Sequence, residues 1–181
     1  MADFYPYLIA SLPMLHFGEK PPFSFERFLE QCRQFIPRQD FQLIAALPVA
    51  VQFSETGTMH GVIRKYIEFE VALRNELVRL RAPRRSADPS VYLRTSPRIG
   101  TSILPPGIGT MGDLAILEDE KKLDETRWKA LDEMAIGHSF DLPLLITYAY
   151  KLLILERWEK IRNADTAILL DQALGSGTRD Q

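Results

Sequence analysis

Cysteine and histidine are scarce in this chain, and neither forms a pattern typical of a disulfide framework or a metal site. A single cysteine, Cys32, occurs among the 181 residues, so no internal disulfide can stabilise the fold. The histidines, His16, His60 and His138, are isolated from one another, and no pair has the short spacing of metal ligands. Because disulfides are typical of secreted proteins and no signal-peptide pattern is present, we expect a cytoplasmic protein without a bound metal.

The chain also lacks a large excess of charge of either sign. Its 22 basic and 24 acidic side chains give a net charge of -2, so there is no global field to attract nucleic acid or an anionic membrane. The apolar stretch from Tyr7 to Leu15 is too short for a transmembrane helix, which needs about 20 such residues. We therefore expect no nucleic-acid partner and no transmembrane segment.

Motifs of common catalytic centres are missing. Neither a G-x-S-x-G nucleophile motif nor a G-K-[ST] phosphate loop occurs. Cys32 falls on an apolar helical stripe, which favours a buried and unreactive thiol. The acidic groups Glu118–Glu120 and Asp124–Glu125 lie near a predicted helix start, where the helix dipole stabilises carboxylates, so we interpret them as solvated caps. The sequence predicts neither an enzyme nor a cofactor-binding protein.

One glycine pattern leaves an alternative open. Gly107–Gly112 matches the G-x-G-x-x-G string, which binds a pyrophosphate when it follows a buried strand and begins a helix. The preceding residues, Ile103–Pro106, include two prolines, and the rest of the chain has helical patterns rather than a βαβ unit. A flexible loop is the favoured interpretation. The alternative is a small helical ligand-binding protein or enzyme that uses the Gly107–Gly112 loop.

Capping residues and apolar spacing predict two helices in the N-terminal third. Ser24 is a suitable N-cap for a helix that ends before Pro37. Its apolar residues at helical spacing are Phe25, Phe28, Leu29, Cys32 and Phe35. A second short helix is predicted over Asp40–Leu47 and closed by Pro48, with an extended strand over residues 49–51 as the alternative.

Three longer helices are predicted in the rest of the chain. Apolar stripes run along Met59–Leu80 and Glu118–Ala135, and Gly137 follows the second stripe at a position typical of a C-terminal cap. Asp141 is a suitable N-cap for a helix that continues to Leu174, which is roughly 33 residues and about 50 Å long. We expect this last helix to pack against the Met59–Leu80 helix, because the two carry the longest apolar stripes.

These patterns predict an all-α fold, an antiparallel helical bundle with long helices. Apolar residues make up 46% of the chain, which is enough for one substantial core. Gly, Pro, Ser and Thr are so frequent near residues 95–112 that we expect an irregular loop there. We expect a single helical domain over residues 1–181, with a subdivision near the 83–113 loop as the alternative.

The most basic part of the chain is a group of four arginines within seven residues: Arg79, Arg81, Arg84 and Arg85. They lie at the predicted end of the Met59–Leu80 helix and in the segment that follows it. Basic side chains suit a helix C-terminus, but four exceed what capping needs. We therefore predict that these arginines contact another protein.

Four segments resemble a known protein family: Tyr5–Leu15, Phe25–Cys32, Phe69–Ala82 and Leu144–Glu159. Together they look like a bacterial family that is similar to the central-stalk subunit of V/A-type ATPases. This subunit is called C in prokaryotes and d in eukaryotes. The similarity involves most of the chain except the 95–112 loop, and it lies in helical packing patterns.

The resemblance implies a non-catalytic subunit of a rotary ATPase, active in ion transport such as proton transport. Such a subunit lies between the membrane ring of proteolipid subunits and the central shaft, and it transmits torque. It implies an all-helical fold, partners among the other ATPase subunits, and a cytoplasmic location peripheral to the membrane. The C and d subunits consist of three similar helical units and are nearly twice as long as this chain, so a complete socket and a part of one are both open alternatives.

Overall fold

Helices make up the regular structure of the residues that the computed structural model describes, which confirms the all-α class. These residues are 4–50, 60–95, 103–108 and 116–176; for residues 50 and 165–176 only the backbone is described. The helices are α1 (Pro6–Ser11), α2 (Phe25–Phe35), α3 (Arg38–Ala45), α4 (Leu47–Ala50), α5 (Gly61–Arg81), η1 (Pro83–Arg85), η2 (Pro89–Val91), α6 (Ile116–Ala135) and α7 (Leu142–Ser176).

The predicted N-cap of α2 is confirmed, but one of its apolar residues does not face the core. The Ser24 hydroxyl accepts a hydrogen bond from the Arg27 amide at 3.2 Å, and Phe28 is completely buried. Phe35 was expected to be buried and is instead 46% exposed. It lies at the last residue of the helix, where the ring of Tyr7 stacks on it with centroids 6.1 Å apart.

The helix predicted over Asp40–Leu47 has different ends in the structure. It spans Arg38–Ala45, and a separate short helix, α4, then begins at Leu47. The prediction that Pro48 closes a helix is therefore wrong, as is the strand alternative for residues 49 and 50. Pro48 lies in the first turn of α4, where its missing amide hydrogen is not needed.

The long helices begin and end close to the predicted residues. α5 has 21 residues, and α7 has 35. The Asp141 carboxylate accepts a hydrogen bond from the Leu144 amide at 3.3 Å, as expected for an N-cap. Gly137 follows α6 with a φ of 82°, a left-handed conformation that glycine adopts without strain.

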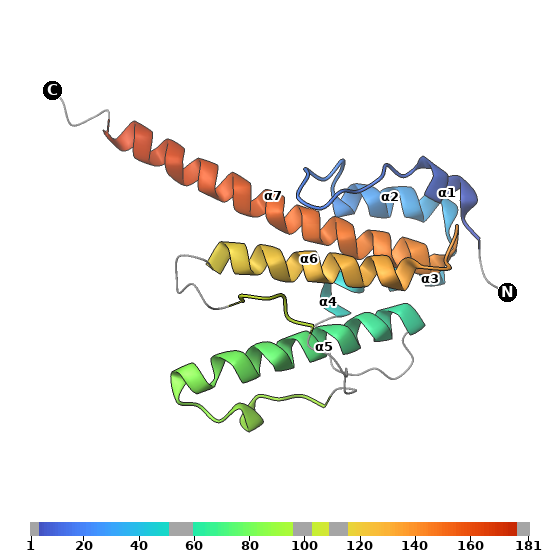
Figure 1. Cartoon of the computed structure of the whole chain (residues 1–181). Helices are drawn as coiled ribbons and strands as arrows, with labels where there is room; N and C mark the ends of the chain where they lie inside the picture. Colours follow the sequence, from blue (N-terminus) through green and yellow to red (C-terminus); the bar gives the residue numbers. More distant parts are fainter. Residues whose placement is uncertain (1–3, 51–59, 96–102, 109–115, 177–181) are drawn as a thin grey trace.

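α7 is the central helix, because α2, α3, α4, α5 and α6 all contact it. Figure 1 shows α6 running antiparallel beside α7, with α5 next to α6 and the C-terminal part of α7 extending past the end of α6. The expected packing of α5 against α7 is thus observed. None of the helices in the described part of the chain has an apolar stretch long enough to cross a membrane.

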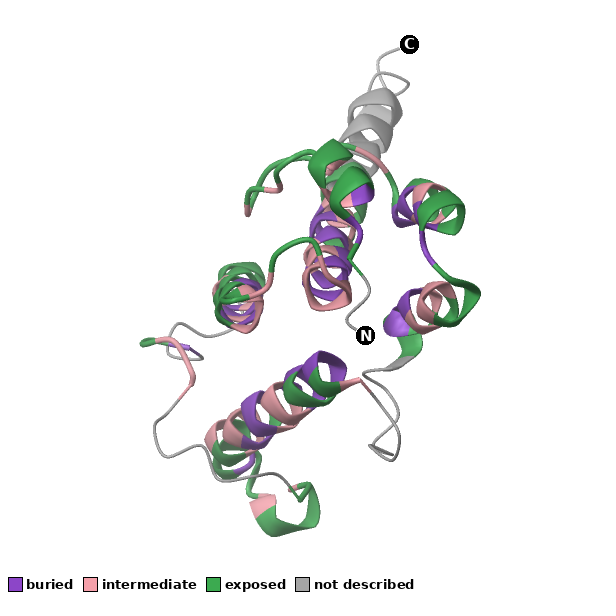
Figure 2. Cartoon of the chain, turned by 90° about the vertical axis from the view of Figure 1, so that its right-hand side faces the viewer, coloured by how far each residue is buried: buried purple, intermediate pink, exposed green. Residues whose placement is uncertain are grey.

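The buried side chains form a main core and a smaller second cluster. In Figure 2 the buried faces of the helices turn toward one another around α7. The largest completely or almost completely buried residues of the main core are Phe28, Leu8, Ile44, Leu47, Leu131, Leu145, Ile146, Leu152 and Leu155. The second cluster consists of Leu73, Ile108 and Leu123, which connect α5, the 103–108 segment and α6.

Cys32 lies in the main core, as predicted, and this gives a first test. Burial raises the pKa of its thiol from 9.0 to about 12, so at pH 8 the folded protein holds a neutral thiol that solvent does not reach. We expect Ellman's reagent to modify it at least about 100-fold more slowly in the native protein than in urea. Equal rates in the two conditions would show that Cys32 is accessible.

Candidate interaction surface

The four arginines identified in the sequence lie where α5 ends and η1 follows. Arg79 and Arg81 are in the last turn of α5, and Arg84 and Arg85 are in η1. All four are exposed. We call this set, Arg79, Arg81, Arg84 and Arg85, the arginine surface. Its exposure agrees with a contact role, and the role itself stays a prediction.

The backbone reverses direction directly after the arginine surface. The Ala82 carbonyl accepts hydrogen bonds from the amides of Arg85 and Ala87, both at 3.0 Å. Ser86 has a φ of 52°, so the reversal uses a left-handed residue. The Asp88 carboxylate then accepts a hydrogen bond from the Ser90 amide at 2.9 Å and caps η2. These local bonds direct the chain back toward α5.

Asn75 fixes the returning segment against α5. Its side-chain amide donates to the Arg94 carbonyl at 2.7 Å, and its side-chain carbonyl accepts from the Arg94 amide at 2.9 Å. Asn75 is only 6% exposed, so both bonds are shielded from water. The segment between Ala82 and Arg94 therefore forms a closed loop attached to α5 at both ends.

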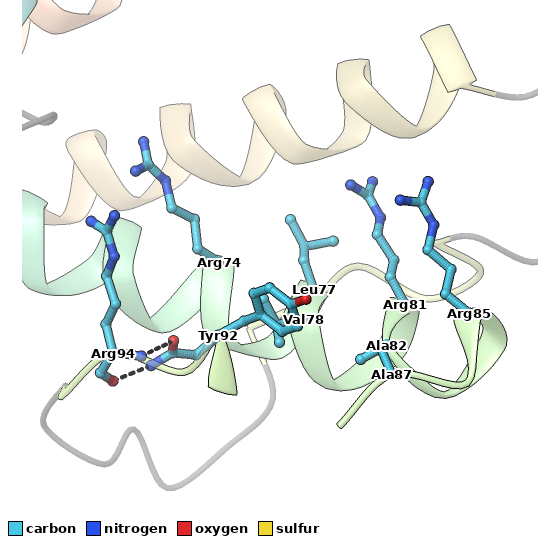
Figure 3. A pocket seen from close by; sticks show the side chains of 10 residues that line it. Arg74, Leu77, Val78, Arg81, Ala82, Arg85, Ala87, Tyr92 and Arg94 are labelled. Atoms are coloured by element: carbon cyan, nitrogen blue, oxygen red, sulfur yellow. Dashed lines mark hydrogen bonds between the residues drawn. The ribbon is translucent and has the colours of Figure 1, made fainter. Parts of the chain in front are cut away.

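A groove of about 610 Å³ lies between α5 and this loop. Its apolar part consists of Leu77, Val78, Ala82, Ala87 and Tyr92, and its polar part of Asn75, Arg74, Arg81, Arg85 and Arg94. None of the described residues that line the groove is acidic. In Figure 3 the side chains of Arg81 and Arg85 extend in the same direction, and the Tyr92 ring lies beside Val78.

Described carboxylates neutralise little of the positive charge of Arg81 and Arg85, which line the groove. Among the residues that the structure describes, no carboxylate lies within ion-pair distance of Arg79, Arg81 or Arg85. Arg74 has one partner, with its Nε 3.8 Å from the Glu70 carboxylate, a long ion pair. The groove is therefore a site of concentrated positive charge on a protein whose net charge is -2.

The structure brings together only some of the arginines that the sequence singled out. Arg81 and Arg85 line the groove, whereas Arg79 and Arg84 do not. Arg74 and Arg94 were missed. The seven-residue spacing of Arg74 and Arg81 places both on one helical face and could have indicated Arg74. Arg94 could not have been found, because its position depends on the fold of the loop.

The opposite side of α5 is held by the 103–108 segment. The Glu76 carboxylate accepts hydrogen bonds from the amides of Ile103, at 3.1 and 3.2 Å, and Leu104, at 3.1 Å. Ile108 is buried in the second cluster. Residues 109–112 of the glycine string Gly107–Gly112 lie outside the described residues. Ligand binding by this loop thus stays the untested alternative to a flexible loop.

A buried group of charges connects α5, α6 and α7. Arg127 donates from Nε to Glu70 at 2.6 Å and from Nη1 to Asp124 at 2.8 Å. Asp124 also accepts a hydrogen bond from the Trp158 indole at 2.8 Å and forms an ion pair with Arg157 at 2.8 Å. We call these five residues the buried charge network after its buried members Glu70, Asp124 and Trp158; the Arg157 side chain is 45% exposed. The hydrogen bonds and ion pairs of the network join α6 and α7 to α5, the helix that lines the groove.

This network corrects the interpretation of Asp124 as a solvated cap. Asp124 is 1% exposed and lies in about the third turn of α6, too far from the helix start to act on the free amides. Asp119 is also buried, although it is in the first turn, while Glu118 and Glu125 are exposed as expected. Asp124 is buried beside Arg127 and Arg157, which form ion pairs with it, and a local sequence pattern does not show these contacts.

The same network sets the charge states of its members and neighbours. Burial alone would lower the pKa of Arg127, but the adjacent Glu70 and Asp124 carboxylates raise it above its usual value, so this guanidinium stays charged. Burial, and then the charge of Glu70, raise the pKa of the Tyr66 hydroxyl well above its usual value. A neutral Tyr66 can thus donate a hydrogen bond to Glu70. These groups are paired with one another and are shielded from ligands.

A metal site would need several His, Cys, Asp or Glu side chains close together in the described part of the chain. No set of three or more His, Cys, Asp or Glu side chains there could hold a metal ion. His138 and Asp141 form a close pair, with Nδ1 and Oδ2 2.7 Å apart, which helps to hold the turn between α6 and α7. The groove beside the arginine surface is therefore the strongest candidate site.

Comparisons with known proteins give no family for this fold. The chain matches no protein-family model, no curated protein sequence and no solved structure.

Proposed function

We propose that this protein is a non-catalytic subunit of a V/A-type rotary ATPase that couples the central shaft to the proteolipid ring during ion transport. Two features support the proposal. The sequence segments of α1, α2, α5 and α7 resemble the central-stalk subunit, and the chain has the all-helical fold that such a subunit needs. The observation that carries the proposal is the arginine surface at the end of α5.

The arginine surface is suited to binding a protein partner. Like charges gathered at a helix end repel one another, and no described carboxylate forms an ion pair with Arg79, Arg81 or Arg85 to offset that repulsion. An acidic partner would remove it, and opposite charges across an interface increase the rate and specificity of association. A loop attached at both ends presents these side chains without disturbing the core.

In this role the protein would contact the membrane only through the proteolipid ring, on the cytoplasmic side. Its partners would be the central shaft and the ring. It would transmit torque and would bind no nucleotide itself. The chemistry of the complex would occur in the catalytic head.

Charge reversal of the arginine surface tests the proposal. Arg84→Glu with Arg85→Glu should leave the melting temperature of the isolated protein nearly unchanged, because exposed substitutions usually alter stability by about 0.5 kcal/mol or less. Co-purification with the other ATPase subunits should fall at least about tenfold, because reversed charges at an interface cost several kcal/mol.

A matched control separates this surface from a general effect of charge. Lys65→Glu with Lys160→Glu changes two exposed cations on α5 and α7 and alters the net charge by the same amount. The control should recover its partners as the wild type does. If the wild-type protein recovers no ATPase subunit, the rotary-ATPase proposal is wrong. Equal recovery with all three proteins would remove Arg84 and Arg85 from the interface.

A further inference from the structure

The groove beside the arginine surface combines positive charge with an apolar floor. The geometry points to an acidic segment of a partner protein as its ligand, with carboxylates on Arg81 and Arg85 and one apolar side chain against Val78 and Tyr92. This inference deepens the proposed function. It rests on that function only for the identity of the partner protein that contains the acidic segment. The groove chemistry itself can be tested separately.

Carboxylates fit the arginines of this groove. Arg81 and Arg85 are exposed, extend in the same direction and have no carboxylate partner among the described residues. A guanidinium offers two parallel N–H donors that match the two oxygens of a carboxylate. Because Arg74 also lines the groove, acidic side chains along an extended or helical segment could each meet an arginine.

The apolar floor favours a protein segment over nucleic acid. Proteins that bind single-stranded nucleic acid use several aromatic side chains, on which successive bases stack. Among the described residues that line this groove, Tyr92 is the one aromatic residue. The net charge of -2 also gives no long-range attraction for a polyanion. A volume of about 610 Å³ suits one or two large side chains, and Leu77 and Val78 provide an apolar contact for them.

The groove is already formed in the free protein, which lowers the cost of binding. Asn75 holds the loop at Arg94, and the Ala82 carbonyl holds it at Arg85 and Ala87. Little backbone has to be ordered when a ligand enters. The partly exposed apolar floor then adds affinity when a ligand covers it, and the exposed arginines select for negative charge.

Fluorescence anisotropy with a labelled peptide tests the inference on the full-length protein. The probe has the pattern Glu-Glu-Ala-Phe-Ala-Glu-Glu, and its reference peptide has Gln in place of each Glu. We expect a Kd of about 1–100 μM for the acidic peptide at low salt, at least about tenfold weaker binding of the reference, and weaker binding as salt is added. Polyuridylate RNA should bind more weakly than the acidic peptide, and inorganic phosphate should not compete at millimolar concentration.

Two variants locate the peptide in the groove. Arg81→Glu with Arg85→Glu should weaken peptide binding at least about tenfold, and Tyr92→Ala should weaken it about tenfold through the lost apolar contact. The Lys65→Glu, Lys160→Glu control should bind as the wild type does. Melting temperatures of all the proteins show whether each one is folded, and the Tyr92→Ala result stands even if the double arginine variant is unstable.

The outcomes separate the groove from the ATPase assignment. Peptide binding that is lost in both groove variants supports the groove, even if no ATPase subunit co-purifies, in which case only the assignment fails. The groove inference is overturned if the acidic peptide does not bind, if both groove variants bind it as the wild type does, if RNA binds more tightly, or if phosphate competes. Co-purification with ATPase subunits in any of these cases would leave the assignment standing.

Discussion

Replacing Arg127 by alanine is expected to lower the free energy of unfolding by about 3–5 kcal/mol. The guanidinium lies between the buried carboxylates of Glu70 and Asp124 and bonds to both. Without it, the two negative charges stay in the protein interior with fewer partners, and the cost of removing them from water is no longer offset. Urea unfolding followed by circular dichroism measures the change.

Arg27→Ala is the matched control for this substitution. Arg27 forms an ion pair with Glu30 at 2.9 Å, nearly the same distance as that between Arg127 and Asp124, but its side chain is 64% exposed. Water already solvates both of its charges, so we expect a loss below about 0.5 kcal/mol. Equal losses from Arg27→Ala and Arg127→Ala would contradict the role assigned to burial in the charge network.

Replacing Phe28 by alanine is expected to cost about 3–5 kcal/mol of unfolding free energy. Its ring is completely buried between α2 and α7, with the Tyr148 ring 5.5 Å and the Phe25 ring 6.1 Å away, centroid to centroid. Truncation removes the apolar surface buried by the ring and leaves a cavity that the surrounding helices fill only in part. The same unfolding experiment gives the magnitude.

Phe35→Ala, in the same helix, provides the comparison. Because Phe35 is largely exposed and has a single ring contact, with Tyr7, we expect a loss below about 1 kcal/mol. Periodicity alone places both phenylalanines on the apolar stripe and would predict similar losses. Similar measured values would mean that Phe35 is buried in solution, contrary to the structure.

The helices could be predicted because their signals are local. Ser24 and Asp141 begin helices because a side-chain oxygen of each accepts a hydrogen bond from the amide three residues later. Both residue types are common N-caps and can be identified from the sequence alone. The apolar stripe of α5 has a period that only a helix places on one face. Two predictions were wrong, the burial of Phe35 and the end of a helix at Pro48. Both residues lie near helix ends, where contacts with neighbouring elements determine burial and helix boundaries.

The buried charge network and the groove could not be predicted in this way. Asp124 looks like a surface carboxylate until α7 brings Trp158 and Arg157 beside it. The groove depends on Asn75 reaching Arg94 across a loop, a contact for which neither residue type gives a pattern. The arginine surface could be predicted because its four arginines lie within seven residues of the sequence. Arg74 and Arg94, which also line the groove, lie further away in the chain and were missed.

The backbone pairing at the start of the chain has a consequence for the order of folding. Phe4 forms an isolated antiparallel bridge with Asp141, and the Tyr5 amide donates to the Phe140 carbonyl at 2.5 Å. The first helix is thus tied to residues made much later in synthesis, whereas α6 and α7 are neighbours joined by a short turn. Closing the long loop costs entropy that the local hairpin avoids. The bridge between Phe4 and Asp141 can therefore form only after the ribosome has released the beginning of α7, whereas the contact of Tyr7 with Phe35 needs only α1 and α2.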